Sequence, residues 1–276
     1  MVYGLEILGT SSYGNCALLR TKSGVFLIDA GFSGKKIIEK LSSMNIDLFQ
    51  IKGVFLTHEH HDHSCGVRGL VNSNPKLEIY ATFGTAKPIQ EKLNRKVNWK
   101  IFTSNTQFYV DDLVVRSFSI PHDAEDPVGF YFEWGERDLF NPCTSLAWVT
   151  DLGHTNEQIL ENVSNADILV LESNYDEILL EQDQNRPQYI KDRTSGRHGH
   201  LSNKAAYRFL VKNYQAKWKK VYLAHLSKDC NSIEAISKTF LKGQEKIFFP
   251  FTLEIYDPLS DILVNILDSN KTPHPV

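Results

Sequence analysis

The chain has 276 residues, 42% hydrophobic content and a formal net charge of -3, which together allow a sizeable buried core. No uninterrupted apolar run is long enough to span a bilayer, and Met1–Glu6 lacks the basic and apolar regions of a signal peptide. These features exclude a membrane-spanning protein. We expect an unexported, cytoplasmic protein with no membrane partner.

The same composition bounds the domain organisation and the redox state. We expect a single domain over residues 1–270, with two smaller domains as the alternative, and a disordered tail over 271–276. No C-x-x-C pair occurs among the four widely scattered cysteines. This pattern favours reduced thiols in a cytosolic setting over a disulfide framework.

Strands bounded by turn signals are expected near 3–8, 15–20 and 25–29. Ser33 can cap a helix from Gly34 to Met44, and a strand at 52–57 follows. Further apolar runs lie at 78–81, 97–102, 107–110, 113–120 and 128–134, with a helix at 84–94. The later chain alternates strands at 145–150, 167–172, 220–224 and 246–249 with helices near 155–163, 174–182, 201–214 and 231–241. The pattern predicts a mixed α/β fold.

A dense run of metal-ligand side chains follows the strand at 52–57. From His58 to His63 the sequence reads His-Glu-His-His-Asp-His. Extended backbone at a strand end directs alternate side chains, His58 and His60, to one side, and Asp62 and His63 can then reach a second ion. A solvated polar turn is the alternative interpretation.

Three more ligand-type residues follow apolar strands. His122 comes after Val114–Ile120, Asp151 after Ser145–Thr150, and His225 after Lys220–Ala224. A lone histidine at such a place is more often a satisfied core residue. Together, however, four strand ends with ligand-type residues are expected where one rim of a sheet assembly gathers them around metal.

These residues resemble the metallo-β-lactamase-fold hydrolases over nearly the whole chain, and all seven ligand positions of that family are present. The resemblance implies a four-layer αββα sandwich. It assigns one metal ion to His58, His60 and His122, a second to Asp62, His63 and His225, and a bridging position to Asp151. Asp29 matches a buried aspartate that orients the histidine loop without ligating. Two divalent ions, Zn or Mn, are expected, and no organic cofactor.

Paired ions about 3.5–4 Å apart can lower the pKa of a shared water to about 7, which would suit an ester, a thioester, a lactam or a phosphodiester equally. The order of Glu172, His200 and His225 resembles that in tRNase Z-type phosphodiesterases. By this resemblance His200 is the general acid, Glu172 holds its proton state, and Asp62 completes the catalytic set. A structural role at a helix start is the alternative for His200.

Four further motifs resemble the WalJ (YycJ) exonuclease branch of this superfamily. They are Gly14-Asn15-Cys16, His122 to Gly129, Thr150-Asp151-Leu152-Gly153 and Gly199-His200-Leu201-Ser202-Asn203. The resemblance implies a metal-dependent 5′ to 3′ exonuclease acting on DNA through a metal-bound hydroxide. The longer stretch Gly135 to Cys143, and Tyr175 where a histidine is usual, depart from the pattern and bear on fine specificity.

Charge is distributed unevenly, because residues 186–220 hold ten Lys or Arg against one acid, Asp192. The segment also carries Tyr189, Tyr207, Tyr214 and Trp218, where bases could stack. An ordinary solvated basic face is the alternative. We expect contacts with the nucleic-acid backbone from Lys191, Arg193, Arg197 and Lys204.

Two other functions remain open at this point. The first is a small-molecule hydrolase, such as a cyclic phosphodiesterase, lactonase or thioesterase, using the same metals. The second is a metal-stabilised binding protein without turnover. The sequence predicts no oligomeric state.

Overall fold

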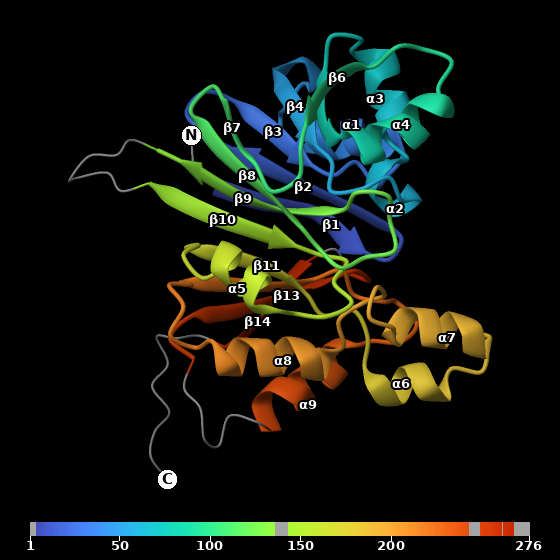
Figure 1. Ribbon diagram of the computed structural model, residues 1–276, viewed down its shortest axis with the longest axis vertical. Coiled ribbons are helices and arrows are strands. Elements are labelled where there is room, and N and C mark those ends of the chain that lie inside the picture. The colour runs from blue at the N-terminus through green and yellow to red at the C-terminus, as the bar shows by residue number, and fades with distance from the viewer. Residues whose placement is uncertain (1–3, 136–142, 243–248, 261, 268–276) are drawn as a thin grey trace. The chain divides into compact units, whose positions relative to one another are not determined.

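The computed structural model describes residues 4–135, 143–242, 249–260 and 262–267 (Figure 1). The chain divides into two compact units, which we call unit 1 (Met1–Thr144) and unit 2 (Ser145–Val276). The single-domain organisation over 1–270 therefore stays a prediction. The tail 271–276 and most of the stretch 135–143 lie outside the described residues.

Unit 1 contains a mixed sheet whose strand order follows the chain from β1 to β6. The first two strand pairs are antiparallel and the remaining ones parallel. The strands are β1 (Gly4–Ser11), β2 (Gly14–Arg20), β3 (Val25–Ile28), β4 (Ile51–Phe55), β5 (Glu78–Thr82) and β6 (Asn98–Phe102).

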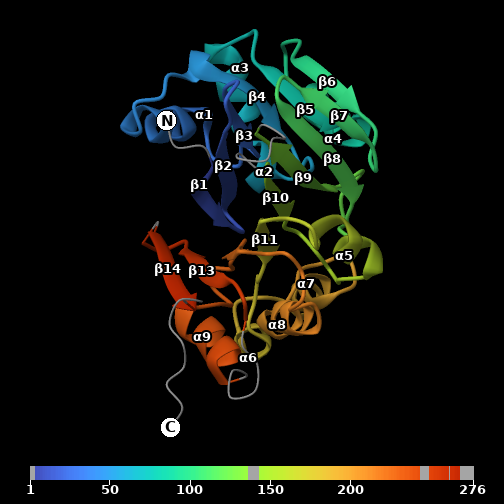
Figure 2. The same cartoon turned by 90° about the vertical axis from the view of Figure 1, so that its left-hand side faces the viewer.

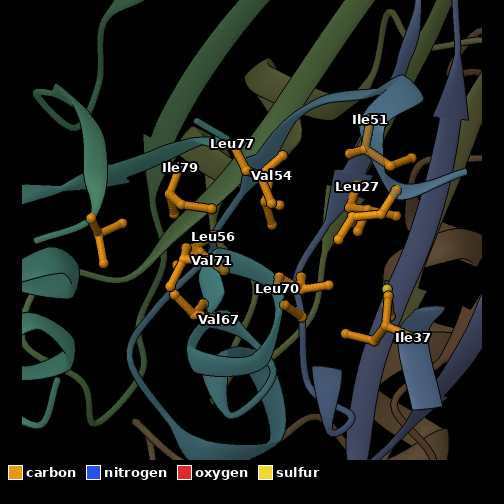
Figure 3. Close-up of a cluster of buried hydrophobic side chains, with 14 of the residues drawn as sticks. Leu27, Ile37, Ile51, Val54, Leu56, Val67, Leu70, Val71, Leu77 and Ile79 are labelled. Carbon is orange, nitrogen blue, oxygen red and sulfur yellow. The ribbon is translucent and has the colours of Figure 1, made fainter. Parts of the chain in front are cut away.

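Helices cover one face of this sheet (Figures 1 and 2). They are α1 (Gly34–Ser43), α3 (Val67–Ser73) and α4 (Phe83–Glu91), and the short η1 (Leu48–Gln50) and α2 (His61–Ser64) lie between strands and helices along the chain. Figure 3 shows Leu27, Val54 and Ile79 from adjacent strands in one buried cluster with Ile37 and Leu70 from the helices. Burying these side chains is the main favourable term for this layer.

The other face of the sheet packs on a second sheet within unit 1. Strands β7 (Gln107–Val110), β8 (Leu113–Ser119) and β9 (Val128–Trp134) pair antiparallel. Side chains alternate along a strand, so Phe55 points away from the helices, and its ring lies 5.1 Å from that of Phe132 and 5.9 Å from that of Phe130. Unit 1 thus shows a helix layer and two sheet layers.

Unit 2 has the sheet order β10-β11-β12-β13-β14, parallel up to β13 and antiparallel at β14. These strands are Thr144–Val149, Ile168–Glu172, Lys220–Ala224, Thr252–Asp257 and Ile262–Leu267. The helices are α5 (Glu157–Val163), α6 (Glu177–Gln182), α7 (Gln188–Ser195), α8 (Asn203–Lys212) and α9 (Ile233–Lys242). Figure 2 shows α8 and α9 side by side.

The predicted mixed α/β class is confirmed, and most elements lie within a few residues of their expected bounds. Ser33 caps α1 as expected, since its side chain accepts a hydrogen bond from the backbone N–H of Lys36. Helices α3 and α7 and strands β13 and β14 were not expected. The strand expected at 246–249 falls on residues outside the described ranges except Phe249, which lies in no strand. Among the helices of the described ranges, none is long and apolar enough to cross a bilayer.

Candidate metal and catalytic site

Three predicted site residues follow strands in a left-handed backbone conformation. Asp29 after β3, Asp151 after β10 and His225 after β12 have φ angles of 60°, 61° and 57°. Such angles cost about 1–3 kcal/mol for a residue with a side chain and cluster at functional sites. At each of these positions the chain turns sharply as it leaves the strand, and the side chain is almost completely buried.

In unit 1, His58, His60 and His122 form one cluster. One ring nitrogen from each lies within 4.8 Å of the others, and His122 Nε2 lies 3.2 Å from His60 Nδ1. His58 is fully buried and His122 is 7% exposed. Three imidazoles with converging nitrogens are a donor set suited to Zn(II) or a first-row neighbour.

Asp29 and Thr57 orient histidine rings of unit 1. His63 Nδ1 lies 2.8 Å from Asp29 Oδ2, and because an ionised carboxylate can only accept, Nδ1 carries the proton and Nε2 keeps its lone pair. The Thr57 hydroxyl donates to Asp29 Oδ1 at 3.0 Å and lies 3.0 Å from His58 Nδ1. With its proton given to Asp29, Thr57 can only accept from His58, which leaves the Nε2 lone pair of His58 for a metal ion as well.

Asn15 fastens the end of the β1–β2 hairpin to the histidine run. Its Nδ2 lies 3.3 Å from the Asp62 carbonyl oxygen and 3.0 Å from His63 Nε2. Gly31 allows this approach, because a Cβ there would lie 1.7 Å from the Asp62 oxygen. Asp62 and His63, whose Oδ2 and Nε2 atoms are 3.6 Å apart, are therefore held by both neighbouring segments.

Glu59 does not join the imidazole cluster. Its Oε1 accepts a hydrogen bond from the backbone N–H of Glu125 at 3.0 Å, and its carbonyl oxygen accepts one from the Ser64 hydroxyl at 2.9 Å. Glu125 lies three residues after His122. Glu59 thus ties the loop that carries His122 to the run that carries His58 and His60.

Unit 2 contributes a second cluster, centred on the fully buried Glu172. Its Oε1 lies 2.7 Å from His225 Nδ1 and 2.8 Å from His200 Nδ1. Its Oε2 accepts backbone N–H groups from Leu152 and Leu201 at 2.8 and 2.9 Å. One carboxylate therefore fixes two imidazoles and the segments that follow Asp151 and His200.

Asp151 completes this cluster, since donor atoms of Asp151, Glu172, His200 and His225 all lie within 4.8 Å of one another. Asp151 Oδ1 is 3.5 Å from His225 Nε2 and 3.7 Å from His200 Nδ1. Burial alone would raise the pKa of Glu172, but the charges and hydrogen bonds of His200 and His225 hold it below its usual range. Glu172 is thus ionised and can only accept, so Nδ1 of both histidines carries the proton in these hydrogen bonds.

A buried amide network supports the segments around Glu172. Asn174 Nδ2 donates to the His225 carbonyl oxygen at 2.7 Å. The Asn231 side chain donates to the carbonyl oxygens of Ser173 and Asn174 and to Asn203 Oδ1 at 2.8–3.0 Å. The network joins the chain after β11, the start of α8 and the segment beyond His225, so it stiffens the backbone of all three.

The basic segment 186–220 covers α7, α8 and the start of β12. Lys191 donates to the Glu181 carbonyl oxygen, and Lys204 pairs with Glu177. Arg193 and Arg197 have exposed side chains. Part of the segment's charge is therefore neutralised locally.

The expectation that four aromatic residues of this segment could stack on bases is wrong for Trp218. This side chain is 2% exposed, and its Nε1 donates to the Val163 carbonyl oxygen. Tyr207 is half-buried and packs edge-on against Phe240, with ring centroids 5.4 Å apart. Tyr189 and Tyr214 are 70% and 46% exposed.

The structure thus places every predicted site residue in one of the two units. Unit 1 brings together His58, His60 and His122, with Asp29, Asp62 and His63 linked to them. Unit 2 brings together Asp151, Glu172, His200 and His225. Sequence reasoning gave no role to Thr57, Asn15 or Asn174; each lies one or two residues from a predicted site residue or inside a quoted motif, which was the available signal.

The donor set fits the divalent metal ions that the resemblance implies. Hydrogen bonds to Asp29 and Glu172 keep the ring proton of His63 and His225 on Nδ1. Their Nε2 atoms are therefore the ring nitrogens with metal-binding lone pairs. Carboxylates hold both rings in that state. The residues of both units are therefore prepared as ligands rather than as solvated polar side chains.

The sequence family described as the beta-lactamase superfamily domain matches residues 25–225 of the chain. The chain belongs to this family, and its fold is the metallo-β-lactamase fold predicted from the sequence. With the two clusters described above, it is a metal-dependent hydrolase.

Two curated relatives are similar over most of their length. Exodeoxyribonuclease WalJ of Streptococcus pneumoniae is 29% identical over 265 residues, covering 93% of this chain and 94% of the relative. Exodeoxyribonuclease YycJ of Bacillus anthracis is 30% identical over 231 residues, covering 83% and 84%. The predicted resemblance to the WalJ (YycJ) branch is confirmed.

Solved structures agree on the fold. The metallo-β-lactamase fold protein YhfI from Bacillus subtilis has a TM-score of 0.69 at 16% identity, covering 95% of this chain and 98% of its own. The short form of human tRNase Z has a TM-score of 0.59 at 19% identity, covering 81% and 92%.

Proposed function

We propose that this chain is an exonuclease that hydrolyses phosphodiester bonds of DNA in the 5′ to 3′ direction with two divalent metal ions. The observation that carries the proposal is the pair formed by His200 and Glu172 beside Asp151 and His225. Hydrolysis of a phosphodiester releases an alkoxide that needs a proton, whereas a thioester releases a thiolate that does not. The two exodeoxyribonuclease relatives support the same substrate class.

His200 is the proposed general acid. Its Nδ1 is bound to Glu172, its Nε2 points elsewhere, and its side chain is 24% exposed, so a substrate oxygen can reach it. In its acid form His200 donates the Nε2 proton to the leaving oxygen, while Glu172 accepts a hydrogen bond from Nδ1 and keeps the ring in place.

The proposed ligand assignment follows the resemblance. His58, His60 and His122 would hold one ion, Asp62, His63 and His225 would hold the other, and Asp151 would be a ligand of both. Divalent ions, Zn or Mn, bound by these residues would supply hydroxide at neutral pH and offset phosphate charge. Asp29 and Thr57 keep the lone pairs of His63 and His58 available, and Asp62 belongs to the catalytic set by carrying its carboxylate beside His63.

Lys191, Arg193, Arg197 and Lys204 are the proposed phosphate contacts in unit 2. Arg193 and Arg197 are chosen for the test because their side chains are exposed, whereas Lys204 pairs with Glu177. Replacing Arg193 and Arg197 by Glu is expected to weaken DNA binding at least tenfold and to reduce its salt dependence, since phosphate contacts release counterions. Unchanged affinity and salt slope in a titration would remove both arginines from the interface.

We also propose a cytoplasmic location, supported by the free state of Cys16, Cys65, Cys143 and Cys230. No oligomeric state is proposed.

The decisive experiment tests substrate and direction together. Purified protein is stripped of metal, reloaded with Zn or Mn, and incubated with end-labelled DNA and RNA of each polarity, next to a lactone and a thioester panel. Stepwise shortening from the 5′ end of DNA is expected. Turnover of the lactone or thioester alone would replace the proposal by a small-molecule hydrolase.

A further inference from the structure

We propose that a surface of unit 1 binds the sugar-phosphate backbone of single-stranded nucleic acid as the strand approaches the cluster of His58, His60 and His122. We call this surface the α1–α3 patch; it consists of Tyr13, Phe32, Lys35, Lys36, Lys40 and Arg68. The proposal rests on the function proposed above, because it assigns part of the substrate path to this chain. It places nucleic-acid contacts outside the basic segment 186–220.

Charge is the first observation. Helix α1 has no acid in its first turn and carries Lys35, Lys36 and Lys40 against one acid, Glu39. Glu39 pairs with Lys35 at 3.8 Å, with both side chains highly exposed. The chain as a whole has a net charge of -3, so a cluster of cations on one helix differs from the average surface and can attract a polyanion.

A second helix adds to the same patch. Gly34 at the start of α1 and Gly69 in α3 are in backbone contact, because a Cβ on Gly34 would lie 2.6 Å from the Gly69 Cα. Lys35 and the exposed Arg68 are the chain neighbours of these glycines. Lys35 of α1 and Arg68 of α3 therefore both lie near the contact between the two helices. The positive charge of the patch is thus spread over two helices.

Phe32 links the lysines of α1 to the β1–β2 hairpin, which contacts Asp62 and His63. The Nζ atoms of Lys36 and Lys40 lie 4.5 and 5.8 Å from the centre of its ring. The same ring fills the space beside Gly9 and Gly14, where a Cβ would lie 2.4 and 2.6 Å from its atoms. The half-buried ring thus holds both ammonium groups against the β1–β2 hairpin.

Tyr13 supplies an exposed aromatic ring at this hairpin. It lies in the turn between β1 and β2 and is 60% exposed. Asn15, two residues on, contacts Asp62 and His63, and Gly31, which precedes Phe32, touches the Asp62 backbone. The patch therefore begins next to predicted metal ligands and continues from Tyr13 through Phe32 to Lys36.

This combination fits a single strand better than other polyanions. Single-stranded nucleic acid is bound by cations that follow the backbone together with aromatic rings on which bases stack. An acidic peptide would use the cations but has no need of an exposed tyrosine. We therefore assign a stacked base to Tyr13 and backbone phosphates to Lys36 and Arg68.

The test uses the metal-loaded full chain with two substrates, a single-stranded DNA oligonucleotide and bis-p-nitrophenyl phosphate, which is too small to reach the patch. The double variant Lys36→Glu/Arg68→Glu is expected to raise the KM for the oligonucleotide at least tenfold. It should also reduce the salt slope of binding by about 1.4, because each lost single-strand phosphate contact removes about 0.7. Turnover of the small diester should stay unchanged.

Tyr13→Ala should raise the same KM, and Tyr13→Phe should restore it, because a phenyl ring still stacks. Lys87→Glu, an exposed lysine on α4, is the matched charge control. An oligonucleotide KM and salt slope equal to wild type in the double variant would overturn the patch, whereas a wild-type protein that cleaves no nucleic acid would overturn the proposed function. Oligonucleotide binding measured by fluorescence anisotropy keeps these two failures distinguishable.

Discussion

The two clusters use their carboxylates differently. In unit 1 the three imidazoles of His58, His60 and His122 converge, and Asp29 reaches His58 only through the Thr57 hydroxyl. In unit 2 the carboxylate of Glu172 touches both His200 and His225 directly. Asp29 also touches His63 directly, at 2.8 Å. Unit 1 thus combines one direct contact with an indirect link through a hydroxyl, whereas both histidines of unit 2 contact the same carboxylate.

This difference separates two tasks. Asp29 and the Thr57 hydroxyl hold the Nδ1 protons of rings whose proposed role is to ligate. Glu172 holds His225 in the same way, but it also holds His200, whose proposed role is to donate a proton. We therefore expect substitutions in unit 1 to act through metal affinity and substitutions at His200 to act through turnover.

The largest effect is expected for His58→Ala. Removing a fully buried ligand from the three-imidazole cluster should abolish measurable hydrolysis and lower the bound metal, measured by elemental analysis of the purified protein. His61→Ala is the matched control, because His61 belongs to the same run but its side chain is exposed. Full metal content in His58→Ala would show that His58 is not a metal ligand and would contradict the proposed cluster in unit 1.

His200→Ala should lower kcat by about 10²–10⁴-fold, the usual contribution of a general acid, and leave the metal content intact. The measurement compares kcat with metal stoichiometry in the same preparation. His198→Ala, two residues away and exposed, should behave like wild type. If His200→Ala instead loses metal, His200 is a ligand and the division of tasks between the clusters fails.

The sequence was sufficient to predict where the candidate ligand residues lie, because they follow apolar strands or belong to the run that follows one. The strand sets the direction of the side chains at its end, such as those of His58 and Asp151. Predicting the strand therefore also predicts where these side chains lie. The family resemblance then supplied the partners that lie far apart along the chain. The fold class was predictable from the same strand pattern, and the ligand set stays a prediction.

The supporting contacts were not predictable, because they depend on backbone turns rather than on strand direction. The left-handed conformation of His225 and the close approach at Gly31 have no local sequence signal that distinguishes them from ordinary turns. Hence the roles of Thr57 and Asn15 became visible only in the structure. Gathering aromatic residues from the basic sequence window likewise included Trp218, which is a core residue.

Thr57→Val tests the indirect orientation in unit 1. The valine keeps the shape but removes the hydroxyl that links Asp29 to His58, and losing such an outer contact typically weakens metal affinity about 10–100-fold. Competition with a chelator measures the affinity. Thr57→Ser keeps the hydroxyl and should retain most of it; equal loss in both variants would indicate a packing role instead.

The smallest effect is expected for Asp167→Asn, a carboxylate of unit 2 that belongs to neither cluster. Partial burial would raise its pKa, but Lys219 and hydrogen bonds from Ser145 hold the pKa below its usual range. The resulting stability is present above the unfolded-state pKa of about 3.9 and is lost as the pH falls through the lower folded-state value.

We therefore expect Asp167→Asn to lower the melting temperature by a few degrees at pH 7, by less near pH 3, and to leave kcat unchanged. Thermal unfolding at both pH values measures this, with the exposed Asp192→Asn as control. A difference that is the same at both pH values would mean that shape, not charge, is what Asp167 contributes. A fall in kcat would mean that turnover in unit 2 depends on carboxylates beyond Glu172 and Asp151, which would weaken the contrast between the two clusters.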